Sequence, residues 1–234
     1  TVDGVAYTFP LGDKTTVFFG DSMDGSTLYN TACVYGGQTK QIDDCGNSGA
    51  AMAGGLGTAA GASYDFGNGF TAAIGYEGQG AAAGKGLMTK EGLDIFGGQV
   101  TYTGDSYGVS VTYSDYEGTN DTTYTAFNAY YTPDSAGSLP SISGGYETGS
   151  VEGATDTEQW FVGLQWDEVG AGTLGVAIAT DGHQAENGSD LYVYEAFYSY
   201  PMNDGMTITP IVFIREASST VDETGIVVKT SFSF

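Results

Sequence analysis

The chain has 234 residues, with 38 Gly, 17 Tyr and 12 Phe but only 5 Pro, a composition that favours many strands and tight turns over helices. Its 29 acidic residues against six basic ones give a formal net charge of -23, which argues against nucleic acid as a partner. The mean hydropathy is -0.12, and no apolar run approaches the roughly 20 residues of a membrane helix. A transmembrane β-barrel stays possible, because its strands are apolar only at alternate positions.

The N-terminal part predicts two hairpins separated by a long loop. Residues 5–11 are apolar at alternate positions, turn at 12–14 and return over 15–21, which is typical of a hairpin. A second hairpin follows over 60–66 and 70–79, with a turn that contains Asn68. The loop between the hairpins, 22–57, contains both cysteines of the chain.

The middle of the chain predicts four more strands, over 96–103, 107–114, 124–132 and 141–147. In the second of them Tyr107, Val109, Val111 and Tyr113 alternate with Gly, Ser and Thr. Aromatic residues at both ends with aliphatic residues between them are typical of a strand that crosses a membrane between two interfacial belts.

The C-terminal part continues the pattern with strands over 160–166, 174–178, 191–200, 206–215 and 225–234. The first of these strands has Trp160 and Trp166 at its ends. Pro210 lies inside the fourth, where it cannot donate a ladder hydrogen bond, so we expect a bulge or an unsatisfied neighbour there.

About thirteen strands are therefore expected in a single domain, 1–234. Short turns alternate with longer loops at 22–57, 79–93, 115–123, 148–157, 181–190 and 216–224, which is the asymmetry of an outer-membrane barrel. The fold class predicted is all-β, a transmembrane antiparallel β-barrel, with a soluble β-sandwich as the alternative. Because single-chain bacterial barrels have an even strand number, we expect the first strands to be missing from this chain and about 16 strands in the complete barrel.

The long loop 22–57 is a candidate constriction of such a barrel, and the alternative is an ordinary outer loop. Cys33 and Cys45 lie close together without a nearby His, so a disulfide is expected rather than zinc. Asp21, Asp24, Asp43 and Asp44 would offer carboxylates to cations, with Lys40 as a counter-charge, or would form a solvated acidic loop. A calcium site at the last two aspartates matches no EF-hand spacing, and no metal or cofactor is predicted.

Four charged residues fall on the strand faces assigned to the lumen: Glu77, Glu195, Arg215 and Lys229. Opposite charges on facing walls would set a transverse field across a narrow polar opening, and pairs that neutralise one another are the alternative. His183 has no Ser or Cys nucleophile at a recognisable spacing, so no enzyme is predicted.

Several motifs together resemble the C-terminal barrel of the cyanobacterial outer-membrane porins, especially the marine forms. They are 7–14 (Tyr-Thr-Phe-Pro-Leu-Gly-Asp-Lys), 32–37 with 43–48, 64–69 (Tyr-Asp-Phe-Gly-Asn-Gly) and 160–166. The resemblance implies a homotrimer in the outer membrane, in contact with the lipid bilayer and lipopolysaccharide, with a wall-binding domain preceding the barrel.

The function expected from this resemblance is passive diffusion of small hydrophilic solutes and inorganic ions. The excess of carboxylates predicts a preference for cations if they line the pore. The alternative function is that of a non-conducting structural or surface-binding protein, built as a β-barrel or a β-sandwich.

Overall fold

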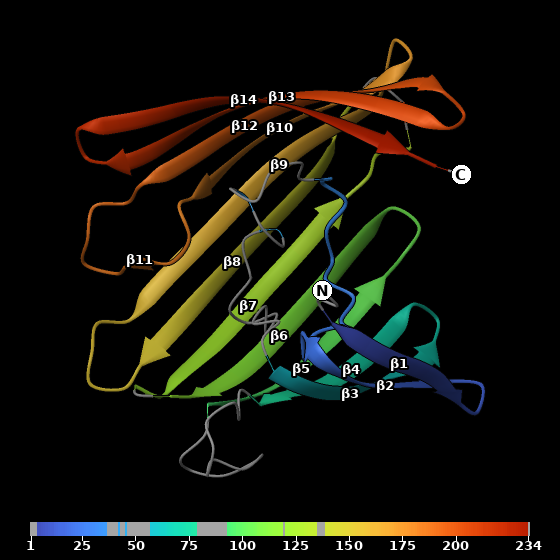
Figure 1. Ribbon diagram of the computed structural model, residues 1–234, viewed down its shortest axis with the longest axis vertical. Coiled ribbons are helices and arrows are strands. Elements are labelled where there is room, and N and C mark those ends of the chain that lie inside the picture. The colour runs from blue at the N-terminus through green and yellow to red at the C-terminus, as the bar shows by residue number, and fades with distance from the viewer. Residues whose placement is uncertain are drawn as a thin grey trace.

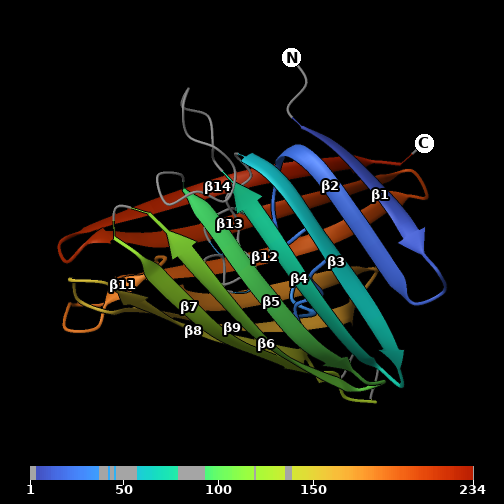
Figure 2. The ribbon, with the colours of Figure 1, turned by 90° about the horizontal axis from the view of Figure 1, so that it is seen from below.

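The computed structural model describes residues 4–36, 42, 45, 57–78, 93–118, 120–134 and 139–233, and these form a single curved antiparallel sheet (Figures 1 and 2). Thirteen strands pair in sequence order, and the short strand β11 adds to β9. Their bounds are β1 Val5–Leu11, β2 Thr15–Met23, β3 Gly57–Gly67, β4 Phe70–Gly78, β5 Asp94–Thr103, β6 Tyr107–Glu117, β7 Thr122–Tyr131, β8 Ser141–Val151, β9 Thr157–Val169, β10 Gly172–Thr180, β11 Gln184–Ala185, β12 Tyr192–Asn203, β13 Met206–Ser218 and β14 Val221–Phe232.

The strand count and the antiparallel order confirm the prediction from the sequence. No helix within the described ranges is long and apolar enough to cross a membrane.

The two faces of the sheet differ in polarity. On β6, Val109 and Val111 are 47% and 46% exposed on the outer face, whereas Ser110 and Thr112 are 2% and 0% exposed on the inner face. Exposed apolar residues recur at the alternate positions of the other strands, from Val5 to Phe232. An apolar outer wall of this extent suits lipid, and a polar inner wall suits water.

Aromatic side chains gather at both ends of the outer wall. Near the short turns, rings contact one another across strands, with centroids 4.8 Å apart for Phe70 and Tyr102 and 5.4 Å apart for Tyr102 and Tyr107. Near the opposite edge, Tyr76 and Phe96 lie 4.9 Å apart. Two such belts mark the levels of the two membrane interfaces.

Three of the predicted loops were too long. The loop expected at 115–123 is shorter because β6 continues to Glu117 and β7 begins at Thr122. The loop expected at 148–157 is confined to the residues between Val151 and Thr157, and the loop expected at 216–224 to those between Ser218 and Val221. These strand ends extend past the aromatic belt at that edge. The alternation of apolar and polar residues that marks a strand in the sequence is lost there.

Of the two outcomes expected at Pro210, a bulge or an unsatisfied neighbour, the β13–β14 ladder shows no bulge there, but the β12–β13 ladder is interrupted beside Pro210. Pro210 pairs with Val228 in an unbroken register, and the irregularity of the β13–β14 ladder lies instead between Glu216 and Ser218. On the other side, the ladder with β12 is interrupted between Phe197 and Tyr200 without a change of register. The side chain of Thr209 donates to that of Ser199 at 3.1 Å inside this gap.

Candidate functional site

After β2 the chain turns inward, and the segment 24–36 lies against the inner wall of the sheet (Figure 1). Side chains from successive strands hold its backbone. Gln99 Oε1 of β5 accepts from the N–H of Asn30 at 2.6 Å, and Ser110 Oγ of β6 accepts from that of Ala32 at 3.0 Å. These contacts hold the backbone of the segment against the inner wall.

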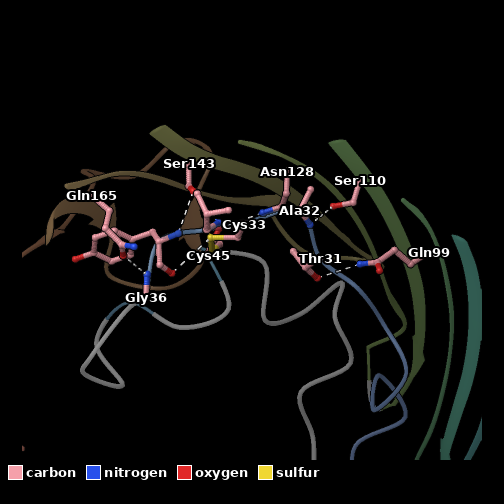
Figure 3. The surroundings of a disulfide bond; sticks show 12 residues. Thr31, Ala32, Cys33, Gly36, Cys45, Gln99, Ser110, Asn128, Ser143 and Gln165 are labelled. Carbon is pink, nitrogen blue, oxygen red and sulfur yellow. Dashed lines mark hydrogen bonds between the residues drawn. A yellow bond between two sulfur atoms is a disulfide. The ribbon is translucent and has the colours of Figure 1, made fainter. Parts of the chain in front are cut away.

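The row continues on the next strands, as Figure 3 shows. Ser143 Oγ of β8 accepts from the N–H groups of Val34 and Tyr35, at 3.0 and 3.1 Å, and Gln165 Oε1 of β9 accepts from Gly36 at 2.9 Å. On β7, between them, Asn128 donates to the carbonyl oxygen of Cys45 at 3.3 Å. We name Gln99, Ser110, Asn128, Ser143 and Gln165 the polar row.

The polar row requires an extended chain. Four strand spacings amount to about 19 Å, and the chain from Asn30 to Gly36 spans about 20 Å when extended, because its six residue-to-residue steps rise about 3.3 Å each. Because N–H groups of alternate residues point the same way in an extended chain, those of Asn30, Ala32, Val34 and Gly36 all face the wall. The backbone of the segment is thereby satisfied by the wall instead of by water.

Glycines of the inner wall make room for the segment. A Cβ atom added to Gly75 of β4 would overlap with the carbonyl oxygen of Gly25, and one added to Gly145 of β8 would overlap with that of Cys45. At Gly163 of β9 an added Cβ would lie 2.7 Å from the ring of Tyr35. A side chain at any of these positions would therefore push the segment away from the wall.

Beyond the polar row the segment packs into an apolar cluster on the inner wall. Tyr35 and Ile42 contact wall residues that face inward, with ring centroids 5.4 Å apart for Tyr35 and Phe161 and 5.6 Å apart for Tyr35 and Phe197. The remaining buried members of the cluster are Ala179, Val193 and Ile211. The predicted disulfide between Cys33 and Cys45 is present and packs against this cluster (Figure 3).

Two carboxylates predicted to face the lumen lie on the inner side but are buried by the segment. Glu77 is 0% exposed, and its Oε2 accepts from the N–H of Gly25 at 3.2 Å. Glu195 is 3% exposed, and its Oε1 accepts from the Tyr35 hydroxyl at 3.0 Å. Both carboxylates hold the segment in place.

Burial changes the acidity of tyrosines in this segment. Desolvation raises the pKa of the Tyr35 hydroxyl far above its ordinary value, and the negative charge of Glu195 and the hydrogen bond to it raise this pKa further. Burial also raises the pKa of Tyr29. Both hydroxyls therefore stay protonated at neutral pH.

The other two predicted lumen charges, Arg215 and Lys229, lie on β13 and β14. Arg215 Nε donates to both carboxylate oxygens of Asp181, at 3.0 and 2.9 Å, and its Nη1 lies 3.5 Å from Glu223. Lys229 is exposed and pairs in register with Thr209, a buried residue of the inner face. These residues line the inner wall at β13 and β14.

The predicted acidic group of the long loop is only partly described. Asp21 lies on the same strand face as exposed Phe19, where its carboxylate accepts from Thr58 at 3.5 Å. Asp24 accepts from the N–H and hydroxyl of Thr27 through its carbonyl oxygen. Lys40, Asp43 and Asp44 lie outside the described residues, as does the rest of the stretch 37–56 apart from Ile42 and Cys45. The described part of the chain contains no group of three or more His, Cys, Asp or Glu side chains that could hold a metal ion.

Comparison with solved structures finds the same architecture in bacterial porins. An anion-selective porin from Comamonas acidovorans aligns over 99% of this chain and 88% of its own, with a TM-score of 0.66 and 12% identity. A variant of the Rh. blastica porin covers 99% of this chain and 77% of its own, with a TM-score of 0.67 and 15% identity. A loop-deletion variant of OmpT, an outer membrane protein of Vibrio cholerae, covers 94% and 76%, with a TM-score of 0.63 and 12% identity.

No family model matches the chain, and no curated protein matches its sequence. At these identities the solved structures establish the fold. The chain forms a transmembrane antiparallel β-barrel of the kind found in bacterial outer-membrane porins.

Proposed function

We propose that the chain forms the pore of an outer-membrane porin and lets small hydrophilic solutes and inorganic ions diffuse passively across the membrane. The observation that carries this proposal is the polar row, which holds the segment 24–36 along the inside of a wall that is apolar outside and polar inside. A segment fixed in the lumen narrows it, which gives a size limit. No chemical step is part of this function.

The resemblance of the sequence to cyanobacterial porins supports a homotrimer embedded in the outer membrane, with lipid and lipopolysaccharide against its outer wall. We further propose about 16 strands in the complete barrel. The first and last strands of the ladder, β1 and β14, each have one edge to which additional strands could pair.

A preference for cations is proposed from the charge of the chain, which has 29 acidic and six basic residues. Glu77 and Glu195 contribute little to this preference, because the segment shields them from the solution. Carboxylates elsewhere on the loops and rims would attract cations to the mouth. The Comamonas acidovorans porin shares the fold and is anion-selective, so we expect selectivity to follow the charges of each chain and not the fold.

Swelling of liposomes tests the proposal. Purified protein reconstituted into liposomes should let small sugars enter quickly and exclude larger ones, because the segment limits the width of the lumen. Folded protein that inserts into liposomes without admitting any sugar would favour the non-conducting structural role.

A further inference from the structure

The connection between β10 and β11, residues 181–183, contains the single histidine of the chain. β10 ends at Thr180, and pairing with β9 resumes when Gln184 meets Glu158. Gly182, between them, has a φ of 68°, a conformation that favours glycine. The side chains on either side of this glycine reach other strands: Asp181 binds Arg215 of β13, and His183 binds Glu147 of β8.

His183 is held on both ring nitrogens. Its Nε2 contacts Glu147 Oε1, and its Nδ1 lies 3.0 Å from the hydroxyl oxygen of Thr157. The ring of Tyr124 of β7 packs edge-on against it, with the centroids 5.1 Å apart. Glu147 is fully buried, whereas the His183 side chain is 21% exposed and can exchange protons with the solution.

Both charge states of His183 fit these partners. The neutral ring donates from Nε2 to Glu147 and accepts at Nδ1 from the Thr157 hydroxyl. The protonated ring donates from both nitrogens, and the Thr157 hydroxyl can then donate to the carbonyl oxygen of Gly149, 3.4 Å away. Protonation therefore breaks no hydrogen bond and adds an ion pair with a buried carboxylate, where solvent screening is weak.

Several other titratable groups lie around this contact. On the histidine's own connection, Asp181 binds Arg215, and the N–H of Glu186 donates to the carbonyl oxygen of Asp156. Facing it, β7 contributes Tyr124 and β8 contributes Glu147, while β9 contributes the uncharged Thr157 and Gln159, and Gln159 donates to Glu147 at 3.0 Å. Histidine is the side chain that ordinarily changes charge between about pH 5 and about pH 8.

We propose that His183 is a positioning residue that fastens the connection 181–191 to the inner wall, with a hold that weakens as the pH rises from about 5 to about 8. The connection is then a second segment, besides 24–36, that is bound to the lumen wall. Its effect on permeation rests on the proposed porin function, but the fastening itself does not.

A spin label on Ser189→Cys measures the fastening without any conduction. Ser189 is exposed, and both native cysteines are joined in a disulfide, so the new thiol is labelled selectively. The ratio of mobile to immobile label should rise about fivefold from about pH 5 to about pH 8, which corresponds to about 1 kcal/mol of ion-pair free energy. The ratio should change less than about twofold in His183→Gln, which keeps a donor to Glu147 but cannot titrate.

Two further variants complete this test. Glu147→Gln removes the ion pair from the other side and should also abolish the pH dependence. Glu158→Gln is the matched control, because this carboxylate of β9 accepts from the Tyr146 hydroxyl at 2.6 Å and not from His183; it should keep the full fivefold change. A label ratio that is independent of pH in the unmodified background, or a pH dependence that persists in His183→Gln, would overturn the proposal.

Single-channel recording then connects the fastening to the pore. The rate of brief current interruptions should rise about fivefold over the same pH range and stay constant in His183→Gln. If no channels appear at any pH, the proposed porin function fails, while the spin label still decides whether His183 fastens the connection. If the rate of interruptions does not change with pH while the mobility of the label does, the connection does not affect permeation, and that part of the inference is overturned.

Discussion

The Tyr35 hydroxyl donates a 3.0 Å hydrogen bond to Glu195, a residue of β12 that follows it by 160 positions and is 3% exposed on the inner wall. This bond joins the inward segment to β12 at a point where water is excluded. It also makes the attachment of the segment depend on the protonation of one phenol.

Alkaline pH should therefore loosen the segment through Tyr35. Its pKa is raised in the attached state by burial and by the charge of Glu195, whereas in an unattached segment it would be near the ordinary value of about 10. Attachment is thus fully stable below about pH 10 and loses up to about 1.4 kcal/mol for each further pH unit. Absorbance titration of tyrosinate checks this. Up to about pH 11, the folded native protein and the folded Tyr35→Phe variant should show equal tyrosinate absorbance changes, because Tyr35 stays protonated. After unfolding, the variant should show the absorbance change of one tyrosine fewer. A smaller amplitude for the folded variant would contradict the raised pKa.

The polar row predicts how backbone groups of the segment exchange with deuterium. Ser143→Ala removes the acceptor of two N–H groups, those of Val34 and Tyr35, at a cost of about 1–3 kcal/mol for each group left buried without a partner. Hydrogen exchange measured by mass spectrometry should speed up at least about tenfold over 30–36. Ser141→Ala is the control, since Ser141 Oγ donates to Thr132 on the same strand face, away from the segment. Equal exchange in both variants would show that the row does not hold the backbone.

Gly144 and Gly145 of β8 are adjacent and face opposite sides of the sheet, so matched substitutions at the two positions test the two faces separately. Gly145→Ala should detach the segment near the disulfide, because the added methyl group overlaps with the carbonyl oxygen of Cys45 and neither backbone can move freely in a packed wall. Gly144→Ala should be close to neutral, because its Cβ would face outward with the nearest atom 3.6 Å away. Thermal unfolding in detergent should show a lower transition temperature for the first variant only, and its channels should have a larger conductance if the segment leaves the lumen. A similar loss in both variants would indicate strand strain instead of segment displacement.

Substitution of Lys229 tests whether charges on the inner wall contribute to ion selectivity. It shares the inner face with Thr209, so Lys229→Glu should shift the reversal potential toward that of a cation-selective pore. The shift should shrink as the salt concentration rises, because the Debye length falls from about 10 Å at 0.1 M to about 3 Å at 1 M. Lys14→Glu, in the short turn between β1 and β2, introduces the same charge change at the rim and should have a smaller effect. Equal shifts in both variants would mean that Lys229 does not face the permeation path.

Most of the fold could be predicted from the sequence because the lipid imposes a strict period of two on each strand. Tyr107, Val109, Val111 and Tyr113 show this period without an exception, and the structure places all four on the exposed face. The period disappears where β6, β8 and β13 extend beyond the membrane, so those strand ends were predicted as loops.

The candidate site was less predictable, because its partners lie far apart in the sequence. The sequence indicated that Glu77 and Glu195 face inward, but not that the segment 24–36 covers both of them. A signal was present in the exceptions to alternation: Phe161, Phe197 and Ile211 are apolar residues at inward positions, where a water-filled lumen would favour polar ones. They form the cluster that receives Tyr35. The glycines beneath the segment gave no such signal, because strands of this chain contain many glycines for other reasons.

Single-channel recording in a planar bilayer, with a salt gradient across it, tests the central claim most directly. The purified protein should give stepwise channels of uniform conductance, and the reversal potential should have the sign of a cation-preferring pore because carboxylates outnumber basic groups. Intact, folded protein that inserts into the bilayer and conducts no ions would contradict the porin function and leave a structural barrel. Channels with an anion preference would preserve the pore and refute the proposed role of the acidic residues.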